Sequence, residues 1–236
     1  MKPQVLLLTC DTNVAAHPFD RTRPAMEALL SPQVDLTVLT NLESIKAGED
    51  LDSFAAIVLH GLYNPRDEVI ERALEDYVCR GKGLVVIHIA SNSFEGSPRF
   101  RRLVGRVWEY GYEKPPFTSD HPPRGAFQVD ILDSAHQITV GLNPFVLTDD
   151  ERYQNLVVAP DAAIQVLATA TIDGRTEPVA WVLTQGSWAS VLSIRGRVFH
   201  ITLGHDLSTY ENTFFREIVL RGLSWAAGET REPSEF

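Results

Sequence analysis

Short, continuously apolar segments that alternate with helix-like patterns constrain the fold of this chain most strongly. Three runs, QVLLLT, FAAIVL and LVVI, lack the polar alternation of a half-exposed strand. Such runs are typical of parallel strands that helices cover on both faces. The predicted elements are strands at 4–9, 34–39, 54–59 and 84–87 and helices at 23–30, 67–79 and 98–104. This alternation predicts a three-layer α/β fold with a mostly parallel sheet.

The second half of the chain follows a different pattern. Residues 106–125 hold four prolines and several aromatic side chains, which is typical of a functional loop or an insertion. Alternating strands follow with few helices between them, so some are expected to be antiparallel. They are predicted at 126–132, 163–168, 179–183 and 198–203, with a closing helix at 214–227. Because no linker or repeat divides the chain, we expect one domain at 1–228 and a charged tail at 229–236.

Composition excludes several classes of function. The chain has 31 acidic and 21 basic residues, a formal charge of −10, which opposes binding to nucleic acid or anionic membranes. Its two cysteines, Cys10 and Cys79, have no CxxC spacing, so neither a disulfide scaffold nor a thiolate zinc site is expected. The first apolar run is too short for a signal peptide, and no run could span a bilayer. We therefore expect a cytoplasmic protein, with the homodimer as the commonest assembly to consider.

Histidines follow several of the predicted strands. His60 and His88 come directly after the third and fourth strands, and His17 lies between the first strand and the first helix. His205 follows the last predicted strand, so it joins this group if that strand is parallel to the others. In open α/β sheets, ligands bind beyond the carboxyl ends of the strands. These four side chains are therefore predicted to converge on one cleft.

Each remaining histidine has a simpler interpretation. His200 lies inside a strand between Phe199 and Ile201 and is expected to be buried and hydrogen-bonded. His121, in the proline-rich segment, is interpreted as solvated, and His136 as a turn residue.

Carboxylates cluster in the stretch TDDERYQN, which contains Asp149, Asp150, Glu151 and Tyr153. One interpretation is a solvated acidic turn. The other is a pocket that contains an acid, a base or a metal ligand, with Tyr153 as a hydrogen-bond donor. Two or three histidines and one acid would suit zinc or a harder divalent ion, while metal-free acid–base chemistry would use the same residues.

Other catalytic patterns are weak or missing. Neither GxxxxGK[ST] nor GxGxxG follows the first strand, so no nucleotide cofactor is expected. The strand-to-helix elbow, where a nucleophile is exposed in some hydrolases, carries His88 and has no GxSxG around it. Cys10 ends an apolar strand, an ordinary place for a buried cysteine, and a hydrolase that uses this thiol is the weakest of the alternatives considered.

An ordered set of motifs resembles the ThuA-like (trehalose utilisation) family of the class I glutamine-amidotransferase-like superfamily. The motifs, in chain order, are HPFDRTRPAMEALL from His17, GKGLVVIH ending at His88, HQIT from His136, DERY from Asp150, GRVFHITLGHD ending at Asp206, and WAAG from Trp225. The resemblance implies a flavodoxin-like αβα fold and a role in disaccharide or keto-sugar catabolism. By position it implies six pocket residues: His17, His88, Asp150, Glu151, Tyr153 and His205.

The resemblance also implies that His88 replaces the superfamily's catalytic cysteine, so glutaminase activity is not expected. The chain departs from the family pattern at Ile89, where a small residue is usual, and at Gln137, where proline is common. His200 lies where members usually carry a pocket-facing aromatic residue. These departures leave the substrate open.

The favoured hypothesis is an enzyme that binds a small carbohydrate in this cleft. His88 and His205 would act as acid–base groups or, with His17, as metal ligands, while Asp150 or Glu151 would orient or deprotonate the substrate. His17, His60 and Tyr153 would contact the sugar. Trp108, Tyr110 and Tyr112 would form an aromatic lid, unless they only pack their loop against the domain. The alternative is a non-catalytic binding module with the same fold.

Overall fold

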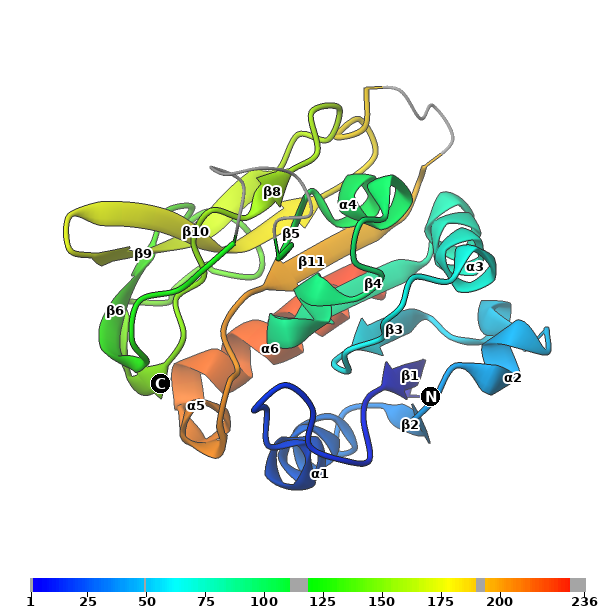
Figure 1. The fold of residues 1–236 in the computed structure, drawn as a ribbon, viewed down its shortest axis with the longest axis horizontal. Coiled ribbons are helices and arrows are strands. Elements are labelled where there is room, and N and C mark those ends of the chain that lie inside the picture. The colour runs from blue at the N-terminus through cyan, green and yellow to red at the C-terminus, as the bar shows by residue number, and fades with distance from the viewer. Residues whose placement is uncertain (1, 49, 111–118, 190–193, 230–236) are drawn as a thin grey trace.

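A nine-stranded mixed sheet forms the centre of the protein in a computed structural model that describes residues 2–48, 50–110, 119–189 and 194–229 (Figure 1). Its strand order is β2-β1-β3-β4-β11-β10-β9-β6-β7. The strands are β1 (Gln4–Leu8), β2 (Asp35–Leu39), β3 (Ala56–Leu59), β4 (Gly83–Ile87), β6 (Gly125–Ile131), β7 (Phe145–Asp150), β9 (Gln165–Ile172), β10 (Arg175–Leu183) and β11 (Arg197–Ile201). A separate pair joins β5 (Arg106–Val107) and β8 (Val157–Val158).

Helices cover both faces of the sheet, as the sequence predicted (Figure 1). The α-helices are α1 (Phe19–Leu30), α2 (Glu43–Lys46), α3 (Glu68–Cys79), α4 (Pro98–Val104), α5 (Leu207–Glu211) and α6 (Thr213–Ala226), and the short 3-10 helices are η1 (Leu51–Ser53) and η2 (His88–Asn92). In the described part of the chain, no helix is long and apolar enough to cross a membrane.

The parallel half of the sheet separates two hydrophobic cores. Strands β2, β1, β3, β4 and β11 pair in parallel. Alternate residues of each strand face opposite sides, so Val5 and Leu7 of β1 join the core under α1 and α6, whereas Leu6 and Leu8 join the core under α3 and α4. Because the central strands are buried on both faces, their sequences are apolar throughout.

The antiparallel half returns to the carboxyl edge of the parallel strands. Strand β11 is followed in the sheet by β10, β9, β6 and β7, and each pair is antiparallel. Four reversals give β7 the same direction as β11, so Asp150 at the end of β7 lies at the ligand-binding edge. In a flat sheet, four strand spacings would separate β7 from β11 by roughly 19 Å. Asp150 nevertheless hydrogen-bonds Gly204 just after β11, so this half of the sheet curls strongly.

Some elements differ from the sequence predictions. Helix α1 begins at Phe19, four residues before the predicted start, so Pro24 lies inside the helix and not in its first turn. Strand β7 was not predicted. Its residues alternate between buried and exposed, and it ends in the acidic stretch that was interpreted, in one alternative, as a solvated turn. Tyr112 and residues 230–236 of the predicted tail lie outside the described residues.

Candidate functional site

Four polar side chains from distant parts of the chain meet at the carboxyl edge of the sheet. They are His17, His88, Glu151 and His205, and one nitrogen or oxygen atom from each lies within 4.8 Å of the others. Strands β4 and β11 are parallel neighbours. The last predicted strand therefore runs parallel to the others, which was the condition for His205 to join this group. All four residues are at most 8% exposed, which removes them from bulk water and strengthens their electrostatic interactions.

His88 occupies a sharp turn at the end of β4. The strand ends at Ile87, η2 begins at His88, and His88 has a φ of +49°. This left-handed conformation is uncommon for residues other than glycine and marks a constrained position. Gly204 faces the turn with a φ of +125°, and a Cβ atom there would lie 3.5 Å from the Cβ atom of His88. The two turns therefore pack closely and hold His88 against His205.

Backbone carbonyls fix the tautomers of two histidines. Nδ1 of His17 lies 2.7 Å from the Ala15 carbonyl, and Nδ1 of His88 lies 2.6 Å from the Thr202 carbonyl. A carbonyl only accepts hydrogen bonds, so each Nδ1 is the donor, and a neutral ring then has a bare Nε2. Burial and the neighbouring histidines lower the pKa of His17 to about 3, which keeps this ring neutral near pH 7.

The two Nε2 atoms face each other at 3.0 Å. Two bare nitrogens at this distance would direct their lone pairs at one another, which is repulsive. The contact therefore requires either a proton or a cation between His17 and His88. Both chemistries considered from the sequence, acid–base and metal-assisted, are consistent with this requirement.

Glu151 supplies the negative charge of the group. Its Oε1 lies 3.1 Å from Nδ1 of His205, and its Oε2 lies 3.5 Å from Nε2 of His88 and 4.0 Å from Nε2 of His17. Burial alone would raise the pKa of Glu151, but the hydrogen bond from His205 and the proximity of His88 outweigh it and hold the pKa well below its usual range. The carboxylate is therefore anionic at neutral pH and can bind a cation.

Asp150, next to Glu151, is turned away from the group of four. Its Oδ1 accepts hydrogen bonds from the backbone N–H groups of Glu151 and His205, and its Oδ2 accepts from Gly204 N–H and the Thr209 hydroxyl. Asp150 is 1% exposed. The structure therefore places this predicted catalytic residue behind the site, where it contacts the backbone that carries two of the four residues.

The chain has relatives among known proteins. A family model described as "Trehalose utilisation", ThuA, matches residues 4–226. The chain belongs to the ThuA family. This confirms the resemblance seen in the motifs and the fold that it implied.

Solved structures of the ThuA type share this fold at low sequence identity. A ThuA-like protein from Parabacteroides merdae is 22% identical, with a TM-score of 0.79 over 99% of this chain and 93% of that one. A ThuA-like protein from Bacteroides uniformis is 16% identical, with a TM-score of 0.70 over 95% of this chain and 92% of that one. A β-galactosidase from Rahnella sp. R3 is 13% identical, with a TM-score of 0.60, and 31% of its chain is covered by 95% of this one. No curated protein matches the chain.

Aromatic side chains form one wall of the candidate site. The Tyr153 hydroxyl lies 3.0 Å from Nε2 of His88, and the two rings stack with centroids 4.7 Å apart. Burial strongly raises the pKa of Tyr153, so the phenol stays protonated and can donate a hydrogen bond. Trp108 packs on Tyr153 with ring centroids 4.5 Å apart, and the half-exposed Tyr110 meets the Trp108 ring edge-on at 5.9 Å. Trp108 is thus a buried residue that supports Tyr153, and Tyr110 is the solvent-exposed residue of this aromatic group.

His121 joins the site, although the sequence suggested only a solvated residue. Its Nε2 lies 3.5 Å from Oε1 of Glu151, and its Nδ1 donates to the Pro122 carbonyl at 2.8 Å. The side chain is 33% exposed, and its ring lies beside Trp108 and Tyr153. It is therefore the most accessible histidine around Glu151, and the aromatic residues of its segment were the only sequence signal for it.

His60 lies next to the group of four but outside it. Its two ring nitrogens bond the Thr9 and Tyr210 hydroxyls, both at 2.8 Å. Burial, with His88 nearby, lowers the pKa of His60 to about 3. His60 also lines a void of about 10 Å³ beside His17, His88 and His205, which is at the lower limit of the space that one water molecule needs. His60 was predicted to contact the substrate, but both of its ring nitrogens are already hydrogen-bonded, so it supports the site from behind.

His200 is buried as expected, but the hydrogen bond predicted for it is missing. It is fully buried, and neither ring nitrogen has a hydrogen-bond partner among the described residues. The Val104 carbonyl accepts the Trp181 indole N–H at 2.9 Å and also lies near the His200 ring, where it opposes the effect of burial on the pKa of His200. His200 packs against the Trp181 ring with centroids 4.2 Å apart. This histidine faces the core and has no contact with the four site residues.

Cys10 lies in a small apolar cluster with Phe19 and Ile89. Burial raises the pKa of its thiol, and Sγ is 3.8 Å from the Leu62 carbonyl. A raised pKa disfavours the thiolate that a nucleophilic cysteine needs. The same cluster explains the departure at Ile89, because the larger side chain fills space against Cys10 and Phe19.

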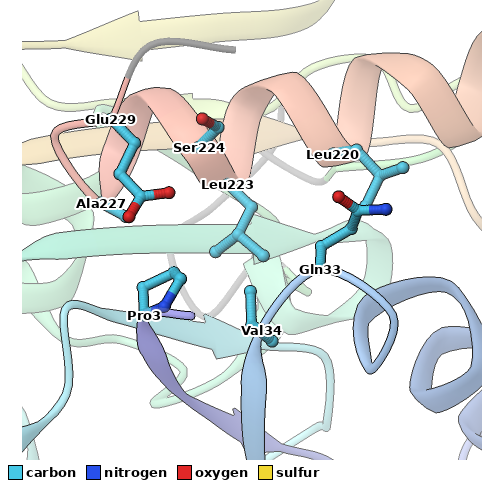
Figure 2. Close-up of a pocket in the computed structure, with 8 residues that line it drawn as sticks. All are labelled: Pro3, Gln33, Val34, Leu220, Leu223, Ser224, Ala227 and Glu229. Atoms are coloured by element: carbon cyan, nitrogen blue, oxygen red, sulfur yellow. The ribbon is translucent and has the colours of Figure 1, made fainter. Parts of the chain in front are cut away.

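A separate hollow of about 220 Å³ lies at the opposite ends of the strands. Figure 2 shows Leu223 of α6 directed toward Pro3, before β1, and Val34, before β2. Its lining is mainly apolar and contains one ionisable side chain, Glu229. The hollow is larger than the void beside the histidines, but it lacks their chemistry, so the carboxyl edge remains the candidate site.

Proposed function

We propose that this ThuA-family protein is a carbohydrate-active enzyme in which His17, His88, His205 and Glu151 hold a divalent metal ion. The observation that carries the proposal is the 3.0 Å contact between the Nε2 atoms of His17 and His88. Each of these rings donates its other N–H to a backbone carbonyl, the arrangement that orients histidines toward metals.

The spacing of the four groups fits one ion. Tetrahedral ligands at about 2.0–2.1 Å from zinc lie roughly 3.3 Å from one another. The corresponding distances are 3.0 Å for His17–His88, 3.4 Å for His88–His205, 3.1 Å for His205–Glu151 and 3.5 Å for His88–Glu151. The distance from His17 to Glu151 is longer, at 4.0 Å, and is measured to Oε2, whereas the His205 contact is to Oε1; all four ligand atoms lie within 4.8 Å of one another. Three imidazole nitrogens and one carboxylate suit zinc or another transition metal.

The surroundings of the site favour a neutral sugar as the substrate. Tyr110 and His121 border the site on its more exposed side, and aromatic rings are suited to packing against the apolar face of a sugar ring. The nearby cations are already neutralised, since Arg124 pairs with Asp149 and Asp206, and Arg21 also pairs with Asp206. An anionic substrate would therefore find no uncompensated positive side chain among these residues. The family description, trehalose utilisation, supports a disaccharide or a keto-sugar derived from one.

The residues divide the chemistry between them. A bound divalent ion supplies a Lewis acid that polarises a carbonyl or hydroxyl oxygen. Tyr153, protonated and fixed beside His88, donates a hydrogen bond to a sugar oxygen. His121, whose Nε2 faces Glu151, contacts the substrate on the accessible side and exchanges a proton with it. Isomerisation and hydrolysis both fit this arrangement, and glutaminase activity is not expected because the elbow carries His88 instead of a thiol.

The test combines metal analysis with a sugar panel. Protein purified without added metal should contain close to one transition-metal ion per chain, and it should convert at least one of trehalose, other disaccharides and their keto derivatives. His88→Ala and His205→Ala should lose both the metal and turnover while keeping a native circular dichroism spectrum. Wild-type turnover by both variants would refute the proposal. Sugar binding by the wild-type protein without turnover would instead identify a binding module.

A further inference from the structure

We infer that Asp150 is a positioning residue that sets the metal affinity of the site without touching the metal. The inference rests on the proposed function, because it concerns the ion held by His17, His88, His205 and Glu151. Asp150 was predicted from the sequence as an acid or base in the cleft. Its contacts instead assign it to the layer behind the ligands.

The hydrogen bonds of Asp150 join two segments that meet only in the folded protein. Its carboxylate lies at the end of β7 and accepts from Gly204 N–H at 2.9 Å and from His205 N–H at 3.1 Å. It also accepts from Glu151 N–H at 2.7 Å and from the Thr209 hydroxyl at 2.8 Å. One side chain thus fixes the backbone of Glu151 relative to that of His205, and these residues supply two of the four ligands.

The negative charge of Asp150 also favours binding of the metal ion. Among the described residues Asp150 takes part in no ion pair, and it is 1% exposed. Backbone N–H groups and one hydroxyl satisfy its oxygens but do not cancel its negative charge. Asp150 and Glu151 together provide two negative charges next to three imidazoles, which matches the charge of a divalent ion.

Loss of this arrangement should weaken metal binding while the fold remains. Substitution of groups that orient metal ligands typically lowers metal affinity about 10- to 100-fold. Asp150→Asn keeps the shape of the side chain but replaces one acceptor oxygen with a donor that faces backbone N–H groups. Thr209→Val removes one hydrogen bond from Oδ2 and leaves the charge in place, so its effect should be smaller, about two- to tenfold.

Asp149→Asn is the matched control. Asp149 is the preceding residue and loses the same charge, but its side chain is partly exposed and pairs with Arg124. It makes no hydrogen bond to the Glu151 or His205 backbone among the described contacts. Asp149→Asn reports the long-range effect of losing one solvated charge in this segment. Thr209→Val keeps the charge of Asp150 and therefore isolates the positioning effect.

The experiment measures Zn²⁺ affinity of the full-length chain by competition with a chromophoric chelator, and the thermal stability of each metal-free variant. Asp150→Asn should bind Zn²⁺ about 10- to 100-fold more weakly than wild type, Thr209→Val about two- to tenfold more weakly, and Asp149→Asn within threefold of wild type. Affinities of Asp150→Asn and Thr209→Val within twofold of wild type would overturn the inference, as would an equal loss in Asp149→Asn. If Asp150→Asn does not fold, the result for Thr209→Val decides. Failure of the wild-type protein to bind Zn²⁺ would refute the proposed metal centre itself.

Discussion

His200 should make the stability of this protein depend on pH, and the structure allows the size of the effect to be worked out. Burial lowers the pKa of His200 to about 3, whereas a histidine in the unfolded chain titrates near 6.5. The unfolded chain therefore binds more protons between these values, so stability falls as pH falls from 6.5 toward 3. For one such group, the loss from pH 7.5 to pH 5 is about 2 kcal/mol.

His200→Leu removes this titration and also the two unpartnered ring nitrogens. Unsatisfied buried polar groups cost about 1–3 kcal/mol each, so the variant should equal or exceed wild-type stability at pH 7.5. At pH 5 its advantage should grow by about 2 kcal/mol. Urea denaturation at the two pH values, followed by tryptophan fluorescence, measures both differences. An unchanged difference between pH 7.5 and pH 5 would show that His200 is protonated in the folded state or differently placed, and the reasoning would be wrong.

Further outcomes follow from the site and the core. Zn²⁺ at about 100 times its Kd should stabilise the wild-type protein by about 2.7 kcal/mol, and thermal scans of His205→Ala should show no such gain. Tyr153→Phe keeps the stacked ring but loses the hydroxyl 3.0 Å from His88 Nε2, so sugar turnover should fall at unchanged metal content, as elemental analysis and product assays would show. Tyr110→Ala should change the unfolding free energy by less than about 0.5 kcal/mol because the side chain is 52% exposed, while raising the KM for a sugar; an unchanged KM would exclude it from the substrate wall. Gly222→Ala should destabilise the protein by about 1–3 kcal/mol or more, since the new Cβ would lie 2.2 Å from the Phe199 ring, and chemical denaturation would measure the loss.

The sequence was sufficient for features that depend on chain order alone. Buried strands and following helices predicted the parallel half of the sheet, and strand ends in such a sheet share one edge. That geometry was enough to predict that His17, His88 and His205 converge. His60 was predicted by the same rule, but its neighbours Thr9 and Tyr210, which occupy both ring nitrogens, come from other segments and gave no local signal.

The features that the residue pattern left open depend on long-range curvature. Asp150 and Glu151 were implied as pocket residues by the family resemblance, but their local pattern also suited a solvated turn, because nothing local shows that β7 curls back to the turn after β11. The contact between His121 and Glu151 depends on the same curvature, because Glu151 directly follows β7. The opposed Nε2 atoms of His17 and His88 depend on the carbonyls of Ala15 and Thr202, and a sequence does not specify which ring nitrogen such carbonyls engage.

The assembly of the site from four distant segments has a consequence for folding. His88 and His205 alone are separated by 117 positions, and each of the four residues follows a different strand or loop. An unfolded or half-folded chain therefore has no preorganised set of ligands, and an ion that binds here would act as a cross-link made only after the sheet is complete. Chelators should then speed unfolding more than they slow refolding, because the cross-link forms after the rate-limiting transition state.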